Sequence, residues 1–437
     1  MKRIFIAVIL SVITLAGYAQ EYDKVNLLIN SKNGVYQKGD SIIVWAQVRK
    51  GCAEHLNFSV RINVTDNYLI NKTVSLPVGK TVLYSGVQDE PIHLIFRVTP
   101  IGEKTGSSVG VIVAPQELRP GYEPPSDLVE FWENQIQAMR LKKMKPKVTK
   151  VESEFDNFDC YAVEIPMHEG NPVTGYMAIP KFADKKSLPI SIFAHGAGVN
   201  KPGNRSSIKT AVWEARRGNG TIGFDINAHG MKLGKPQEYY DALNSGDLHK
   251  YNQRPLESHD KFYFRLMYLR LVRALDYLVT RPEWDGERVL IHGSSQGGCQ
   301  AGVLAGIDPR VTAALLRVPG LTDAGGKLVN GRLGGGPKPY VMNAEGELER
   351  EILPYYDTAL LLSLTKADVL IETGLVDITC PPSGHCAAFN YANTPNKEIL
   401  FFPYRPHMPN NIDSRHKDRY ERDVKSRINE FYNEHLR

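Results

Sequence analysis

One glycine-rich segment has the residue types and the setting that a nucleophile requires. The sequence Gly-Ser-Ser-Gln-Gly-Gly occupies 293–298, between an apolar run at 289–291 and a helical pattern at 299–304. A serine at such a strand-to-helix turn is strained, and small residues two positions away on either side relieve its contacts. Its hydroxyl then stands clear of the backbone at the positive end of a helix. The segment predicts that Ser295 is a nucleophile.

A serine hydroxyl needs a base to accept its proton, and the base needs an acid to orient it. With this kind of turn, the acid and then the histidine follow the serine on loops after later strands. His407 follows the predicted strand 399–402 through a short loop. His416 and His435 lie in a predicted terminal helix, and His385 opens an earlier helix. The order of the residues favours His407 as the base.

The acid is expected at the end of the preceding strand, 369–371. Asp377 lies on the loop that follows this strand, shortly before Pro381 and Pro382. From there its carboxylate can reach back across the sheet edge toward the histidine. Glu372 is the competing acid, but it lies within the strand and would have to be buried. We therefore predict that Asp377 orients the base.

Serine attack on a carbonyl creates an oxyanion, which two backbone N–H groups must hold. One donor is expected to be Gln296, the residue after the nucleophile. The other is expected from His-Gly-Ala-Gly at 195–198, which follows the predicted strand 190–194. We assign this second donor to Ala197, with Gly196 as the alternative.

The elements that would position these residues are short apolar runs separated by helical patterns. The runs are 190–194, 221–225, 289–291, 314–318, 369–371 and 399–402, and the clearest helices are about 260–280 and 415–435. Such an alternation predicts a mostly parallel sheet with helices on both faces. With the serine turn at its centre, residues 116–437 are predicted to form an α/β-hydrolase domain.

The region 20–115 has a different pattern, without helical periodicity. Alternating runs at 41–48, 58–64 and 92–98 are separated by turn sequences that contain glycine or proline. This pattern predicts a small antiparallel β-sandwich of the immunoglobulin kind. A packing and spacer role is favoured over a sugar-binding module or a wall of the catalytic cleft.

The first nineteen residues have the pattern of an export signal. Lys2 and Arg3 precede an apolar run at 4–15, and Gly17-Tyr18-Ala19 forms a small-x-small cleavage site. We expect 1–19 to be a cleaved signal peptide and the protein to be secreted or periplasmic, with an N-terminal membrane anchor as the alternative. No later segment is long and apolar enough to suggest a membrane span.

Composition argues against several classes of partner. The net charge of +5 is spread along the chain without a basic block, which argues against nucleic-acid binding. The sequence has no HExxH or CxxC pattern, so neither a metal site nor a cofactor is expected. Five scattered cysteines do not form a disulfide framework, although Cys380 and Cys386 are close enough to bridge.

The region from about 124 to 435 resembles the family of acetyl xylan esterases and cephalosporin C deacetylases. The motifs that carry the resemblance are His-Gly at 195–196, Ser-Gln-Gly-Gly at 295–298, Gly-Leu-Val-Asp at 374–377 and Cys-Pro-Pro-Ser at 380–383. The resemblance implies an α/β-hydrolase with Ser295, Asp377 and His407 as its triad.

Two departures from the family pattern stand near the expected site. Asn227-Ala228-His229 occupies the place of the family's Arg-Gly-Gln, and Met408 follows the histidine where the family has glutamate. Familiar members are single-domain, cytosolic rings, whereas this chain carries an export signal and an additional β domain. The expectation of a homo-oligomer rests on the resemblance alone.

Together the motifs and the resemblance predict a serine carboxylesterase that removes acetyl or similar small acyl groups from carbohydrate through an acyl-enzyme. Acylated carbohydrate is then its expected partner. A methyl esterase of uronic-acid polymers and a peptidase are alternatives on the same fold. A carbohydrate-binding protein without catalysis is the alternative from a different class.

Overall fold

The computed structural model describes residues 25–51, 55–254, 256–329, 332 and 347–437. The expected signal peptide, 1–19, lies outside the described residues. The chain divides into two compact units, Met1–Ala114 and Pro115–Arg437, and the division falls next to the boundary expected after residue 115.

The N-terminal unit consists of two β-sheets. In its described part the sheet orders are β1-β3-β6 and β2-β8-β7-β4-β5. The strands are β1 Val25–Ile29, β2 Val35–Tyr36, β3 Ile42–Val48, β4 Leu56–Ile62, β5 Tyr68–Val74, β6 Gly79–Gly86, β7 Ile92–Pro100 and β8 Ser107–Val113. The pairs are antiparallel except for the short β2, which runs parallel to β8. Alternate residues of β3 are buried, as a strand with one covered face requires.

The C-terminal unit is built on a nine-stranded sheet with the order β17-β16-β15-β14-β12-β13-β11-β10-β9. Its strands are β9 Lys147–Lys150, β10 Phe158–Ile165, β11 Val173–Pro180, β12 Leu188–Ala194, β13 Ile222–Ile226, β14 Trp284–Ser294, β15 Ala313–Arg317, β16 Asp368–Gly374 and β17 Lys397–Phe402. The strands from β12 to β17 run parallel, and β9, β10 and β11 extend the sheet in antiparallel fashion. The α/β prediction is confirmed, with each of the six predicted strands in this sheet.

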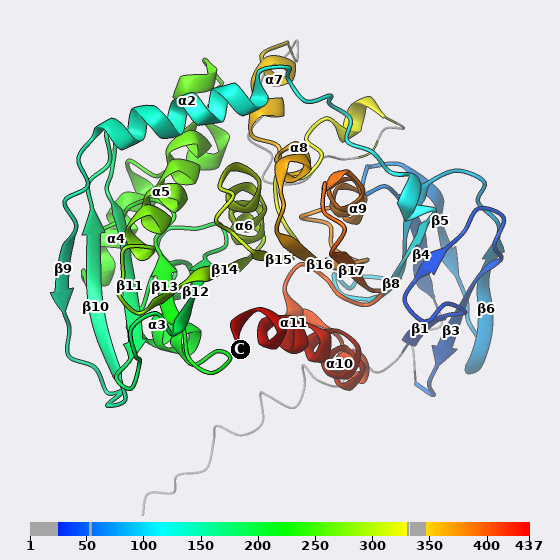
Figure 1. The fold of residues 1–437 in the computed structure, drawn as a ribbon. Coiled ribbons are helices and arrows are strands. Elements are labelled where there is room, and N and C mark those ends of the chain that lie inside the picture. The colour runs from blue at the N-terminus through cyan, green and yellow to red at the C-terminus, as the bar shows by residue number, and fades with distance from the viewer. Residues whose placement is uncertain (1–24, 52–54, 255, 330–331, 333–346) are drawn as a thin grey trace, which may run out of the picture. The chain divides into compact units, whose positions relative to one another are not determined.

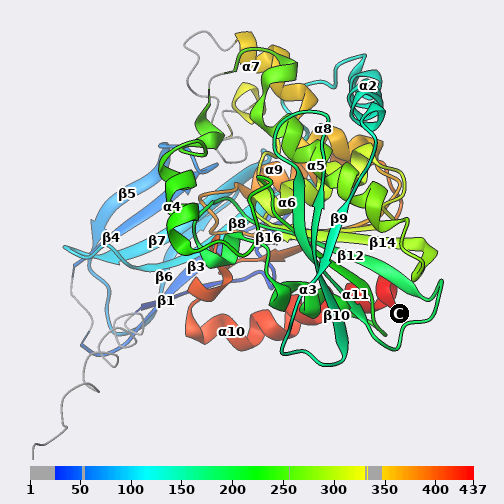
Figure 2. The same ribbon diagram turned by 90° about the vertical axis from the view of Figure 1, so that its left-hand side faces the viewer.

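Helices cover both faces of this sheet, and both ribbon views show the same two layers (Figures 1 and 2). One layer contains α2 Leu128–Leu141, α5 Tyr263–Leu278, α6 Gln296–Ile307, α8 Thr358–Leu361 and α9 Pro382–Tyr391. The other contains α3 Ile208–Ala215, α10 Ser414–Tyr420 and α11 Ser426–Leu436, with the π-helical turn Glu421–Lys425 between the last two. The short helices α4 Gln237–Ser245 and α7 Glu347–Ile352 are the remaining α-helices of the described residues.

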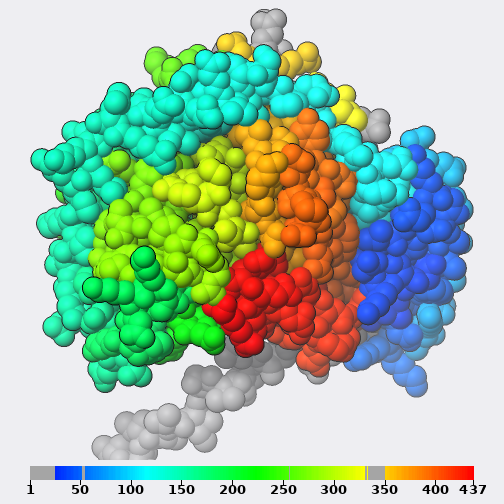
Figure 3. All heavy atoms as spheres, viewed as in Figure 1, coloured from blue at the N-terminus to red at the C-terminus, as the bar shows by residue number. Residues whose placement is uncertain are grey.

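The predicted apolar stripe of α5 is buried, but so is most of the rest of that helix. The reason is that α5 packs against the sheet on one side and against α2 on another. The C-terminal helices α10 and α11 lie instead at the surface, where Figure 3 shows them in red.

The strand order reverses at β12, which lies between β13 and β14. Ligand sites of open α/β sheets form at the carboxyl ends of the strands beside such a reversal. The loops that follow β12, β14, β16 and β17 all leave this edge, and they carry the residues predicted from the sequence. In the described part of the chain, no helix has both the length and the apolar character that crossing a bilayer requires.

Candidate active site

Ser295 occupies a sharp turn between β14 and α6. Its backbone angles are φ 59° and ψ −123°, a conformation that is strained for a residue with a side chain. The turn needs small neighbours, because a Cβ on Gly297 would lie 2.1 Å from the Ala194 carbonyl oxygen. Backbone hydrogen bonds fix the turn from the next strand: the N–H of Ser295 donates to the Arg317 oxygen at 2.9 Å.

The structure brings the three predicted residues of the triad into contact. The Nε2 atom of His407 lies 3.0 Å from Ser295 Oγ, and its Nδ1 atom lies 2.8 Å from Asp377 Oδ2. Asp377 is fully buried, and its Oδ1 atom accepts hydrogen bonds from the N–H groups of Thr379 and Cys380. A carboxylate accepts only, so Nδ1 carries the proton and Nε2 is free to accept the serine proton.

Glu372, the competing acid, does not contact His407. It helps instead to hold the loop that carries His407. It is buried in β16, where Arg317 and Arg405 form ion pairs with its two oxygens. Burial alone would raise the pKa of Glu372, but the two guanidinium charges outweigh it and lower the pKa to about 2. Arg405 in turn donates to the carbonyl oxygens of Pro406 and His407, at 2.7 and 3.0 Å.

The other three candidate histidines contact groups other than Ser295. His385 is buried in α9, with its Nε2 atom 3.1 Å from the Pro319 carbonyl oxygen. His416 stacks on Tyr404 with ring centroids 3.6 Å apart. His435 lies on α11, 3.8 Å from Asp368.

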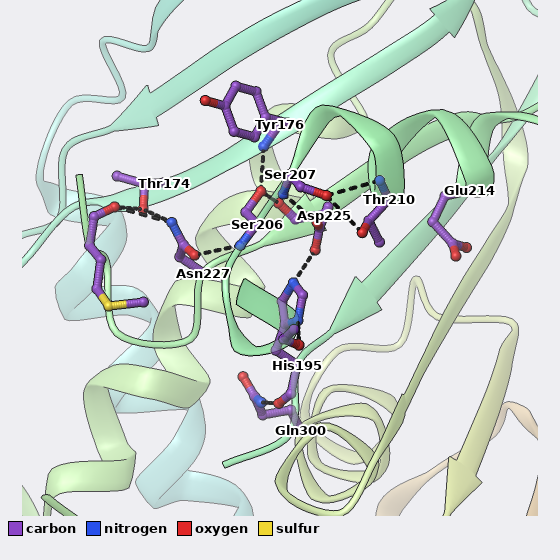
Figure 4. A network of polar contacts seen from close by, with 12 residues as sticks. Thr174, Tyr176, His195, Ser206, Ser207, Thr210, Glu214, Asp225, Asn227 and Gln300 are labelled. Atoms are coloured by element: carbon purple, nitrogen blue, oxygen red, sulfur yellow. Dashed lines mark hydrogen bonds and ion pairs between the residues drawn. The ribbon is translucent and has the colours of Figure 1, made fainter. Parts of the chain in front are cut away.

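The loop after β12, which carries Ala197, is anchored by a buried polar network (Figure 4). His195 Nε2 lies 2.5 Å from Asp225 Oδ1, and its Nδ1 lies 3.0 Å from the Gly203 carbonyl oxygen. Both partners accept, so both ring nitrogens donate and the ring is an imidazolium. Burial by itself would lower the pKa of His195, but Asp225 outweighs it and the pKa is raised. The second Asp225 oxygen accepts from the Ser207 N–H at 2.8 Å.

The two segments assigned to the oxyanion donors lie against each other. A Cβ on Gly196 would meet the Ser294 oxygen at 3.4 Å, and the side-chain amide of Gln300 donates to the His195 oxygen at 3.1 Å. Gln296 is the first residue of α6, directly after Ser295. The carbonyl oxygen of Ala197 accepts a hydrogen bond from the Asn204 amide, which fixes the orientation of the peptide between Ala197 and Gly198.

Sequence reasoning missed Asp225, the partner of His195, and Cys380, which contacts Ser295. Asp225 ends an apolar run, and a charged residue in a buried strand was the one available signal. The thiol of Cys380 is in hydrogen-bonding contact with Ser295, and burial raises its pKa, so it stays protonated. Cys380 and Cys386 are free thiols, both buried, and do not form the bridge that their spacing allowed. Among the described residues, no group of three or more His, Cys, Asp or Glu is placed to hold a metal ion.

Comparison with known proteins places this geometry in a family. Residues 114–421 match the family described as acetyl xylan esterase (AXE1). The acetyl esterase Axe7A of Xylanibacter ruminicola is 31% identical over 340 residues, which are 76% of this chain and 75% of that protein.

Two solved structures have the same fold over most of the chain. The acetyl xylan esterase from Paenibacillus sp. R4 aligns with a TM-score of 0.58 and 25% identity, covering 72% of this chain and 98% of that one. Acetyl xylan esterase 1 from Thermoanaerobacterium sp. aligns with a TM-score of 0.57 and 22% identity, covering 73% and 97%. With the family match and the 31% identical relative, these alignments establish that the chain belongs to the acetyl xylan esterase family of α/β-hydrolases.

Proposed function

We propose that this esterase removes acetyl, or similarly small acyl, groups from carbohydrate, with Ser295, His407 and Asp377 as its catalytic triad. The observation that carries the proposal is the hydrogen-bonded chain from Asp377 through His407 to the Ser295 hydroxyl. The names of the relatives, an acetyl esterase and acetyl xylan esterases, support a small acyl group on a sugar.

The reaction follows from the proton positions. Ser295 Oγ attacks the ester carbonyl carbon while its proton passes to His407 Nε2. The tetrahedral intermediate then collapses, and the imidazolium returns that proton to the departing sugar oxygen. A water molecule attacks the acyl-enzyme, gives its proton to the same nitrogen, and releases the carboxylic acid as the serine recovers its hydrogen.

The other groups act by holding charge and orientation. The N–H groups of Gln296 and Ala197 donate to the oxyanion of each tetrahedral intermediate. Asp377 keeps the proton of the neutral His407 on Nδ1 and stabilises the imidazolium that forms during the reaction. Three donors to the Asp377 carboxylate, the N–H groups of Thr379 and Cys380 and the Nδ1 proton of His407, are in place before substrate binds, so little reorganisation is needed.

We also propose that the protein is exported, with 1–19 cleaved as a signal peptide, on the strength of the charged, apolar and small-residue pattern described above. Expression in a bacterial host followed by fractionation tests this. A mature N-terminus at Gln20 in the periplasm or medium is expected, and an uncleaved chain in the membrane fraction would contradict it.

The function is tested by acetate release from acetylated xylan and from simple sugar acetates. The wild type should release acetate, and Ser295→Ala should lower kcat by about 10⁶-fold, to the limit of detection. A wild type that is silent on every acetyl ester would overturn the proposal, and equal activity of the Ser295→Ala variant would overturn the assignment of the nucleophile.

A further inference from the structure

Gly198, the residue after Ala197, has both of its backbone polar groups bound by buried side chains. Its N–H donates to the hydroxyl of Tyr251 at 3.2 Å, and its carbonyl oxygen lies 3.2 Å from Nε2 of His229. Tyr251 begins a short 3-10 turn, and His229 lies on the loop after β13. Gly198 has φ +136°, and a Cβ there would overlap the Asn204 amide, so this tight approach requires glycine.

The protons of this cluster can be assigned from the partners. A carbonyl only accepts, so Nε2 of His229 carries the proton. Burial, together with the charge of Arg270, lowers the pKa of His229 to about 3, and the ring is therefore neutral. Its Nδ1 atom then accepts from the hydroxyl of Tyr263 at 2.8 Å. Tyr251, which accepts from Gly198, donates to Oε1 of Gln296 at 2.7 Å.

The cluster joins the two segments that carry the proposed oxyanion donors. One end holds Gly198, whose peptide nitrogen is bonded directly to Ala197, and the other end holds the side chain of Gln296. The rings pack closely: the centroids of His229 and Tyr251 are 4.4 Å apart, and those of Tyr251 and Tyr263 are 5.1 Å apart. Oxyanion donors act only when they lie about 2.7–3.1 Å from the developing charge, so their separation must be fixed closely.

We propose that Tyr251 and His229 are positioning residues that set the spacing between the Ala197 and Gln296 N–H groups. This inference rests on the proposed function. It also explains one departure of the sequence, because His229 stands at the third position of the family's Arg-Gly-Gln. A glutamine amide could donate to the Gly198 oxygen as the Nε2 proton of His229 does, so the exchange keeps the donor.

The test compares Tyr251→Phe, His229→Leu and His229→Gln with the wild type. Tyr240→Phe is the matched control, since it removes a hydroxyl that donates to the backbone carbonyl oxygen of Lys232 at 2.8 Å and does not touch Gly198. Two rates are measured for each: kcat and KM on p-nitrophenyl acetate, and the rate at which a fluorophosphonate labels Ser295. The phosphonate oxygen occupies the oxyanion site, so labelling reports on it without any sugar substrate.

We expect Tyr251→Phe and His229→Leu to lower kcat by about 10- to 100-fold, less than the loss of a donor itself, with KM changed by no more than about twofold. Labelling should slow in parallel. His229→Gln should recover most of the rate, and Tyr240→Phe should equal the wild type. Because His229 is neutral at working pH, the shape of the pH–rate profile should be the same for His229→Gln and the wild type.

Labelling of folded Tyr251→Phe at the wild-type rate, or a His229→Gln variant as slow as His229→Leu, would overturn the inference. Thermal unfolding of each variant identifies loss of fold, and if Tyr251→Phe does not fold, the two His229 variants decide. A wild type that is labelled but releases no acetate would overturn the proposed function while the labelling rates still test the positioning. A wild type that is not labelled would overturn both.

Discussion

In the described part of the chain, two histidine–aspartate pairs, His407–Asp377 and His195–Asp225, differ in what the second ring nitrogen meets. His407 lies 2.8 Å from Asp377, and its other nitrogen faces the Ser295 hydroxyl at 3.0 Å. His195 lies 2.5 Å from Asp225, and its other nitrogen faces the Gly203 carbonyl at 3.0 Å. The His407 side chain is 19% exposed and that of His195 is 3% exposed.

The difference shows that a pair of residue types does not by itself define a role. A hydroxyl can give up its proton and take it back, so the pair that faces Ser295 can move a proton. A carbonyl can only accept, so the pair that faces Gly203 holds a fixed charge and ties a loop to β13. The first pair is suited to chemistry, and the second is suited to holding Ala197 in place.

Among the variants that test this comparison, Asp377→Asn should have the largest effect. An asparagine amide in place of the carboxylate favours the wrong tautomer of His407, so kcat should fall by about 10⁴-fold with KM little changed. Steady-state kinetics on a sugar acetate measure this, with thermal unfolding as the check on folding. A loss of less than about tenfold would mean that this pair does not carry the proton, and the contrast with His195 would fail.

A second variant, Glu372→Gln, tests whether the first pair depends on the ion pairs beneath its loop. It leaves Arg317 and Arg405 without a buried counter-charge, which should lower the free energy of unfolding by about 3–5 kcal/mol. The pKa of Glu372 is lowered from 4.5 to about 2, so its stabilisation is present above pH 4.5 and is lost as the pH falls toward 2.

Urea unfolding between pH 3 and 6 measures both effects of Glu372→Gln. The unfolding free energy of the wild type should fall more steeply than that of the variant below pH 4.5. Equal slopes would show that Glu372 does not titrate with the lowered pKa. A stable variant with unchanged kcat would show that the His407 loop is held by other contacts.

How well the sequence predicts each contact of this site depends on how far apart in the chain its two residues lie. Ser295 lies in a local turn with its own glycine pattern, and the chain order then restricts the acid and the base to the loops after β16 and β17. The Asp225–His195 contact has no such local sign. An aspartate at the end of a predicted strand does not show which residue it pairs with until the strand order places it beside β12.

The same limit applies to Tyr251. Its hydroxyl meets Gln296, which is 45 positions away in the chain, through a loop that carries no regular pattern. The fold class could be predicted because apolar runs and helical patterns repeat along the chain. The β2 strand, with its two residues, is too short to give any pattern.

A third variant, Asp225→Asn, removes the charge from the second pair. The buried His195 can then no longer keep both protons at low cost, so it loses one hydrogen bond, and the free energy of unfolding should fall by about 2–3 kcal/mol. We expect kcat to fall by no more than about tenfold, since Ser295 and His407 keep their contact. Urea unfolding and kinetics on the same preparation measure this. A 10⁴-fold loss of kcat in a stable variant would show that the His195–Asp225 pair has the same role in the reaction as the His407–Asp377 pair.

The smallest effect concerns the pH at which the buried His195 ring loses one of its two protons. The pKa of His195 is raised above 6.5, so its contribution to stability is complete below pH 6.5 and is lost as the pH rises through the raised value. Glutamine at 195 does not titrate. The difference in unfolding free energy between the wild type and His195→Gln should therefore be largest near pH 6 and shrink at higher pH by up to about 1.4 kcal/mol per pH unit.

Urea unfolding at constant ionic strength from pH 6 to pH 9 measures this difference, because titrating groups whose pKa values do not depend on His195 cancel. A difference that stays constant over that range would mean that His195 is neutral when folded. One ring nitrogen would then lack its proton, and the ring could not donate to both Asp225 and the Gly203 carbonyl. The second pair would be a neutral hydrogen bond like that between His229 and Gly198, and a fixed charge would no longer distinguish it from the pair at Ser295.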